Sequence, residues 1–171
     1  MISLIFPNLI HEEQVMDYRN EFLINHDSMD GTAGLRDYED YVLWLERIKN
    51  NNNRNTRLDG LVPATTLLVI RESDDYLVGM VDIRHELNDY LYNYGGHIGY
   101  SVRRSERRQG YATELLRLTL RKCKELALDK TLVCCNKDNI ASARTIMSNG
   151  GVLENEVIED GELVQRYWIK C

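Results

Sequence analysis

The chain has 171 residues, of which 43% are hydrophobic and 28% charged, and its net charge at pH 7 is −6. This length predicts one domain, residues 1–171, with a core of its own, and the composition excludes disordered, collagen-like and proline-rich chains. No apolar run approaches the roughly 18 residues of a membrane helix, and no secretory signal opens the chain. The acidic balance argues against a nucleic-acid binder. We therefore expect a cytoplasmic protein that binds neither membranes nor nucleic acid.

The first half of the chain predicts two helices among four strands. Apolar residues at helical or alternating spacing, with turn residues between them, set the bounds. In chain order the predicted elements are a strand at 2–6, helices around 15–23 and 38–48, and strands at 66–71, 77–84 and 97–102. Residues 72–75 predict a hairpin, and the tyrosine-rich residues 87–96 read as a connector.

The second half alternates helices and strands before a final hairpin. A helix from 112 to 127 fits the 3.6-residue period closely, and a buried strand at 131–135 follows. A helix at 139–149 ends at two glycines. Asp160 and Gly161 then predict a tight turn between two strands. This order of elements predicts one mixed sheet with helices packed on it.

Residues 107–112, Arg-Arg-Gln-Gly-Tyr-Ala, connect a predicted strand to a predicted helix. A glycine-containing loop at a helix N-terminus offers free backbone N–H groups and the positive end of the helix dipole, which together suit a pyrophosphate. Residues 101–126 carry eight basic and three acidic side chains, so one positive segment lies in an acidic protein. The alternative is an ordinary basic loop whose glycine serves only a turn. Neither the Walker nor the Rossmann phosphate pattern is present.

The same six residues resemble the coenzyme A-binding motif, Q/R-x-x-G-x-G/A, of the GNAT superfamily of N-acetyltransferases. Asn139-Ile140-Ala141-Ser142, with Gly150 beyond it, resembles the second half of the family pattern. Residues 85–87 and 95–100 resemble a bacterial subgroup of uncharacterised predicted acetyltransferases. The resemblance implies an α/β (α+β) fold in one domain, with a mixed, mostly antiparallel sheet that splays between its fourth and fifth strands and is flanked by helices.

The resemblance also implies acetyl-CoA as a co-substrate and assigns its contacts. The pantetheine arm would pair with the strand that ends at Val102, the thioester oxygen would lie near the N–H of Tyr100, and the pyrophosphate would rest on the amides of residues 108–113. The implied binding residues are Tyr100, Ser101, Val102, Arg107, Arg108, Gln109, Gly110, Tyr111, Ala112, Thr113, Asn139 and Ser142.

One position departs from the family pattern. Many relatives carry a tyrosine four residues after the Ser142 position, where it acts as the acid for the leaving thiolate, and this chain has Ile146 there. Because a thiol has a pKa of about 8.5, its thiolate leaves tolerably well without a dedicated acid. Water, Ser142 or another tyrosine is then the expected proton donor.

The expected acceptor is a primary amine of a small molecule or peptide, which must lose a proton before it attacks. His97 is the first candidate for the base, followed by Glu86 and His85, all near strand ends that an antiparallel pairing brings together. Each of the three has a structural role as its alternative. The tyrosines of residues 90–94 either wall the acceptor pocket or simply pack.

Two functions remain open on the sequence alone. The first is an acetyltransferase that works by direct attack of the amine. The second is a binding module that senses acyl-CoA without turnover, which only Ile146 favours. The adjacent Cys134 and Cys135 are expected in the core, with a nucleophile as the alternative. No metal ligand pattern appears, and a homodimer is possible.

Overall fold

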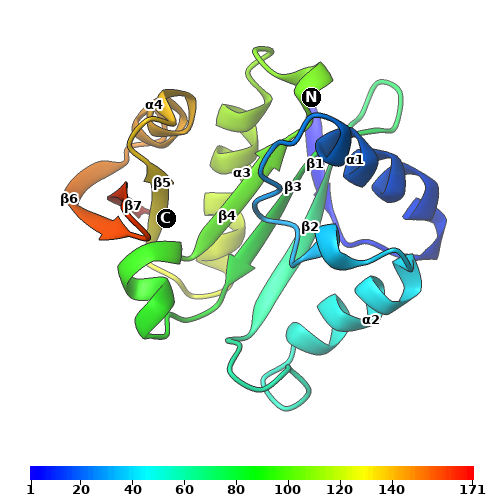
Figure 1. Ribbon diagram of the computed structural model, residues 1–171, viewed down its shortest axis with the longest axis horizontal. Helices are drawn as coiled ribbons and strands as arrows, with labels where there is room; N and C mark the ends of the chain where they lie inside the picture. Colours follow the sequence, from blue (N-terminus) through cyan, green and yellow to red (C-terminus); the bar gives the residue numbers. More distant parts are fainter.

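The computed structural model describes all of residues 1–171 and contains seven strands and four α-helices (Figure 1). In chain order these are β1 (Ile2–Ile5), α1 (Glu12–Ile24), α2 (Tyr41–Asn51), β2 (Ala64–Arg71), β3 (Tyr76–Arg84), β4 (Ile98–Val102), α3 (Tyr111–Glu125), β5 (Lys130–Asn136), α4 (Ile140–Ser148), β6 (Val152–Glu159) and β7 (Glu162–Lys170). The predicted order and type of every element are confirmed. The tyrosine-rich connector contains one turn of π-helix, Leu91–Gly95.

Polar residues at the element ends explain several boundaries. The Asp40 side chain accepts hydrogen bonds from the N–H groups of Val42 and Leu43, so α2 begins at Tyr41 and not at Tyr38 as predicted. Asn139 caps α4 by accepting from the N–H of Ser142. At the β6–β7 turn, Asp160 and Gly161 have φ values of 48° and 86°, as the predicted tight hairpin requires.

The strands form two antiparallel sheets, where the sequence predicted one mixed sheet. The first sheet has the order β1-β2-β3-β4 and the second the order β5-β7-β6. The predicted splay of the fourth and fifth strands is confirmed, because a single bridge between Gly96 and Val133 joins the two sheets. The ladder does not continue past this bridge, and β4 and β5 each remain edge strands.

Two hydrophobic cores lie on opposite faces of the first sheet (Figure 1). The α1/α2 core consists of Val15, Tyr18, Phe22, Leu35, Tyr41, Trp44, Leu45, Ile48, Leu68, Ile70, Leu77 and Met80. The α3/α4 core consists of Ile2, Leu67, Val69, Val78, Val81, Ile83, Ile98, Val102, Leu115, Leu116, Leu120, Cys123, Val133, Ala143, Ile146, Tyr167 and Ile169. Each large side chain fully buried in these cores contributes about 1.5–3 kcal/mol to folding. The helices are all too short or too polar to cross a membrane.

Candidate functional site

The end of the loop between β4 and α3 (residues 103–110) and the first turn of α3 together contain six consecutive backbone N–H groups without a partner. The N–H groups of residues 108–113 donate no hydrogen bond within the protein. Arg108 and Gly110 have φ values of 64° and 84°, and left-handed residues in such a loop turn successive N–H groups toward one side. The positive end of α3 lies at the same place. This run of amides, which we call the amide cradle, is suited to a phosphate group.

Gly110 leaves the space beside the amide cradle open. A Cβ atom built on this residue meets no other atom within 4 Å, so the protein itself does not fill the space. Its left-handed φ is costly for residues with a side chain. Both properties agree with a glycine that lets a ligand approach the backbone.

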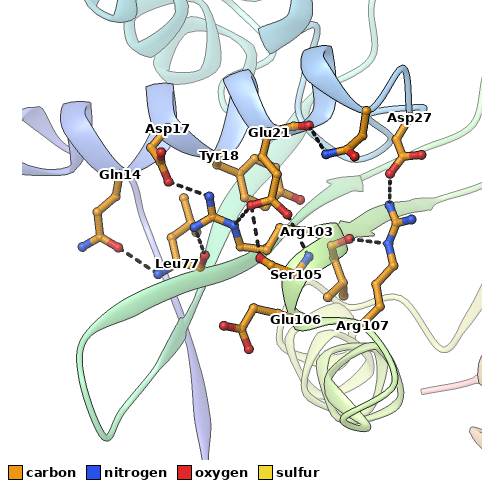
Figure 2. Close-up of polar contacts among 12 residues, drawn as sticks. Gln14, Asp17, Tyr18, Glu21, Asp27, Leu77, Arg103, Ser105, Glu106 and Arg107 are labelled. Carbon is orange, nitrogen blue, oxygen red and sulfur yellow. Dashed lines mark hydrogen bonds and ion pairs between the residues drawn. The ribbon is translucent and has the colours of Figure 1, made fainter.

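Helix α1 holds the β4–α3 loop in place through a buried arginine (Figure 2). The Arg103 side chain is only 2% exposed and lies 2.6 Å from Asp17 and 2.7 Å from Glu21. The second oxygen of the Glu21 carboxylate accepts a hydrogen bond of 2.8 Å from the N–H of Ser105. Two carboxylates of α1 therefore fix the first half of the loop.

The ionised state of Glu21 is part of this arrangement. Burial acts to raise the pKa of Glu21, but the Ser105 N–H and the charge of Arg103 stabilise the carboxylate more strongly. The pKa of Glu21 therefore lies below its usual value, and the group is charged at neutral pH.

Arg107, the first residue of the predicted motif, also points back into the protein (Figure 2). Its Nε donates to the carbonyl of Val102 at 3.0 Å, and its Nη2 lies 2.9 Å from Asp27, just beyond α1. The guanidinium thus connects the loop to the end of β4 and to the segment that follows α1. Its predicted contact with a phosphate stays a prediction, and its present contacts are those of a residue that positions the loop.

The second half of the loop is anchored to β2. Glu106 lies 2.7 Å from Arg71 and accepts a hydrogen bond of 2.9 Å from the side chain of Gln109. Arg71 also donates to the hydroxyl of Tyr111 at 3.3 Å. The sequence analysis did not identify these anchors or those of α1, since the partners lie 35 to 86 residues apart. The only signal was an arginine-rich loop in a chain rich in acidic residues.

The outer edge of β4 offers further backbone groups. The N–H of Arg84 donates to His97, and the N–H of Arg103 donates to Val78. Because bonded pairs alternate along an antiparallel ladder, the backbone groups of Tyr100 and Val102 face away from β3. Those of Ser101 face β3, so the predicted backbone pairing along this edge is left to Tyr100 and to the N–H of Val102, whose carbonyl already accepts from Arg107. The Ser101 hydroxyl lies 2.9 Å from that of Tyr18.

Across the gap from β4, helix α4 presents the predicted Ser142. Its hydroxyl lies 2.8 Å from the hydroxyl of Tyr100, and this contact connects β4 with α4. Burial raises the pKa of Tyr100 to about 12, so its hydroxyl is protonated at neutral pH. Ile146 is fully buried in the α3/α4 core and offers no polar atom.

Residues 4–152 match the family model described as an acetyltransferase (GNAT) domain, which covers most of the chain. This chain belongs to the GNAT acetyltransferase family. The resemblance that the loop motif indicated is therefore confirmed. No curated protein matches the sequence.

Solved structures share this GNAT fold at low sequence identity. The microcin C7 self-immunity acetyltransferase, in complex with acetyl-CoA and AMP, has a TM-score of 0.71 and 18% identity over 99% of this chain and 92% of its own. Dodecameric spermidine N-acetyltransferase from Vibrio cholerae gives 0.68 and 16% over 99% and 93%. The protein yncA from Salmonella typhimurium, solved with its cofactor acetyl-CoA, gives 0.65 and 12% over 99% and 93%.

The three candidate bases of this GNAT protein do not meet at one point. His85 and Glu86 follow β3, where the backbone N–H of His85 donates to Pro63 on the β2 side. Glu86 forms an ion pair with Arg54. His97 lies on the opposite side, at the junction with the second sheet. The strand ends pair as expected, because the N–H of Arg84 donates to the carbonyl of His97 at 2.8 Å, but no hydrogen bond joins the three side chains, and their catalytic roles stay predictions.

His97 connects the two sheets through both its backbone and its ring. Its N–H donates to the carbonyl of Leu132 at 2.7 Å, and its Nδ1 accepts from the N–H of the same residue at 2.9 Å. The neutral ring therefore carries its proton on Nε2 and has no free lone pair for a second proton. Burial, and then the charge of Arg84, lower the pKa of His97 to about 4. These contacts favour a structural role over the role of a base.

We expect His97→Asn to keep the fold and the activity, because an asparagine oxygen can replace Nδ1 as the acceptor for Leu132. His97→Ala leaves that buried N–H without a partner and should cost about 1–3 kcal/mol in unfolding free energy. In the wild type, the unfolded ring binds a proton near pH 6.5 and the folded ring only near pH 4, so stability present above pH 6.5 is lost as the pH falls toward 4. Urea unfolding across this range should show a smaller loss for His97→Asn. A folded His97→Asn protein with activity reduced about 100-fold or more would restore His97 as the base.

Proposed function

We propose that this protein transfers an acetyl group from acetyl-CoA to a primary amine of a small molecule or peptide, and that residues 1–171 act as one acetyltransferase domain. The observation that carries the proposal is the amide cradle, six free N–H groups at the start of α3 in a GNAT chain. The open edge of β4 leads away from it. Together they provide contacts for a diphosphate and for an extended arm attached to it.

In this proposal the diphosphate lies on the N–H groups of residues 108–113 and the pantetheine arm follows the outer edge of β4. The N–H of Tyr100, which faces that edge, donates to the thioester oxygen and stabilises the negative charge that develops there. The amine nitrogen attacks the thioester carbon directly. The C–N bond forms, the C–S bond breaks, and coenzyme A leaves as a thiolate.

The ammonium proton needs an acceptor, and of the two candidate histidines only His85 has a ring nitrogen free to take it. Thr65 donates to Asn52 at 2.7 Å, so its oxygen accepts from Nε2 of His85, also at 2.7 Å. Nδ1 of His85 is then free to take a proton. Strand geometry places His85 about 13 Å along the sheet from Tyr100, so in this proposal His85 takes the proton through water.

The amine releases one proton to the base, and the leaving coenzyme A thiolate takes up one proton from a donor on its own side of the site. Ile146 cannot supply it, whereas the Ser142 and Tyr100 hydroxyls lie together between β4 and α4. Because a thiol has a pKa of about 8.5, the thiolate is a stable enough leaving group that it does not require a strong acid as the donor. Either hydroxyl, or water beside them, can therefore stabilise the sulfur as it leaves.

Direct attack predicts that Cys134 and Cys135 are dispensable for chemistry. Burial raises the pKa of Cys134 to about 12 and also raises that of Cys135, so neither is a thiolate at neutral pH. The double alanine variant should lose thermal stability yet keep kcat within a few-fold of the wild type. If it folds but has no turnover, and the wild type shows an acetylated cysteine by mass spectrometry, the reaction proceeds through an acyl-enzyme.

A sensor of acyl-CoA on the same fold is the alternative function, favoured by the absence of the family tyrosine at Ile146. Calorimetric titration with acetyl-CoA, followed by thiol release with a panel of polyamines, aminoglycosides and peptides, separates the two. An enzyme binds and releases thiol only when an acceptor is present, whereas a sensor binds and never turns over. Location in the bacterial cytoplasm and a homodimer remain predictions of the sequence.

A further inference from the structure

The turn between α3 and β5, residues 126–129, brings together two cysteines that the proposed reaction does not use. On the helix side, the carbonyl of Cys123 in α3 accepts a hydrogen bond of 3.0 Å from the N–H of Leu128. On the strand side, the carbonyl of Asp129 accepts a hydrogen bond of 2.9 Å from the N–H of Cys171, which follows β7. One short turn is therefore bonded to the backbones of both cysteines.

The side chains of the two cysteines meet at the α3/α4 core. Cys123 is fully buried in this core. Cys171 lies two residues after Ile169, and because side chains alternate along a strand, it projects from the same face of the second sheet and packs against the same core. Its thiol lies 3.9 Å from the hydroxyl of Thr131, a buried residue of β5. Cys123 and Cys171 are also side-chain hydrogen-bonding neighbours of each other, so their sulfur atoms lie close together.

We propose that Cys123 and Cys171 form a disulfide bond when the protein meets an oxidant of the disulfide class, and that this bond ties the end of α3 to the last strand of the second sheet. The inference does not depend on the proposed function, because neither cysteine belongs to the candidate site. Burial raises the pKa of Cys123 to about 12 and also raises that of Cys171, so both are thiols at neutral pH. The pair therefore stays reduced until such an oxidant is supplied.

Two exchange steps form the bond when glutathione disulfide is the oxidant. Cys171 reacts first because it is partly exposed, whereas Cys123 is fully buried. The Cys171 thiol loses its proton, its sulfur attacks one sulfur of glutathione disulfide, and one glutathione leaves. The deprotonated sulfur of Cys123 then attacks the sulfur of Cys171, and the second glutathione leaves. The two cysteines thus lose two protons and two electrons, and one glutathione disulfide becomes two reduced glutathione molecules.

The bond closes a long loop of the chain. Residues 124–170, which include β5, α4, β6 and β7, lie between the two cysteines. A cross-link across a loop of this length restricts the unfolded chain and thereby stabilises the folded one. It also fixes α3 to the strand that supplies Tyr167 and Ile169 to the α3/α4 core. We expect the melting temperature to rise by about 5–10 °C.

The test incubates the whole folded chain with glutathione disulfide in the absence of denaturant. Mass spectrometry of unreduced peptides should show a cross-link between Cys123 and Cys171, and dithiothreitol should reverse both the cross-link and the rise in melting temperature. Cys171→Ser should form no cross-link and show no such rise. The matched control is the double variant Cys134→Ala/Cys135→Ala, which keeps the proposed pair and should show the same rise as the wild type on oxidation.

A folded protein that stays reduced under conditions in which the urea-unfolded chain forms the cross-link would overturn the inference, because the folded geometry would then oppose the bond. A cross-link from Cys123 or Cys171 to Cys134 or Cys135 in its place would overturn it as well. So would a Cys171→Ser protein that gains the same stability in glutathione disulfide as the wild type.

Discussion

Gly110→Val should weaken the binding of acetyl-CoA by at least tenfold while the protein stays folded. The native φ of 84° costs a side-chain-bearing residue about 1–2 kcal/mol, and a branched Cβ enters the open space through which a phosphate must approach. The lost hydrogen bonds to a charged ligand add about 1.5–3 kcal/mol. The backbone cost lowers the stability of the folded protein, and the lost contacts predict a Kd about 10- to 150-fold higher, measured by calorimetric titration.

Gly60→Val is the matched control for this change. Gly60 has a φ of 81° and a built Cβ there also meets nothing within 4 Å, but the residue lies in the loop before β2, far from α3 in the sequence. The two variants carry the same backbone cost, so their melting temperatures should fall by similar amounts. If Gly110→Val is folded and binds acetyl-CoA as tightly as Gly60→Val, the amide cradle is not the coenzyme site.

Gly96→Ala should be the most destabilising single methyl addition at the junction of the two sheets. A Cβ atom on Gly96 would lie 2.5 Å from the carbonyl oxygen of Leu132, and the φ of 68° is itself unfavourable for alanine. Leu132 belongs to β5 and cannot move without shifting its ladder with β7. Overpacking and the backbone cost together predict a loss of about 2–5 kcal/mol in unfolding free energy.

The neighbouring Gly95→Ala serves as the control, because its built Cβ clashes with the end of the Leu91 side chain, at 2.7 Å, and otherwise makes an ordinary contact of 3.6 Å with the Tyr90 ring. That side chain can rotate away, so the expected loss is about 1 kcal/mol or less. Urea unfolding followed by circular dichroism measures both. Equal losses for the two variants would mean that the bridge between the sheets does not depend on a glycine at residue 96.

The sequence predicted the elements well because their signals are local. The helical period of α3 and the turn residues Asp160 and Gly161 act within a few residues, and the loop motif lies within six. Local signals could not predict which residues the β4–α3 loop contacts, because those residues are distant in the sequence. Asp17 and Glu21 look like ordinary surface residues of an amphipathic helix until the fold brings α1 beside Arg103.

His97 shows a second kind of limit. A histidine at the start of a strand near a candidate active site has the right pKa for a base when it is exposed. Its actual state depends on the backbone N–H of Leu132, which occupies Nδ1, and on burial between two sheets. The resemblance implied a splay between the fourth and fifth strands, but no local signal indicated that the His97 ring itself bonds across it to Leu132.

The two cores become complete at different moments as the chain leaves the ribosome. All members of the α1/α2 core lie between Val15 and Met80, so they can pack as soon as β3 has been synthesised. The α3/α4 core requires Tyr167 and Ile169 and stays open until the last strand is available. The anchors from α1 and β2 thus precede the β4–α3 loop in the chain, and they are synthesised before the loop that they hold. The core under α3 therefore gains Val133 of β5 and Ile146 of α4 first, and the last strand completes it.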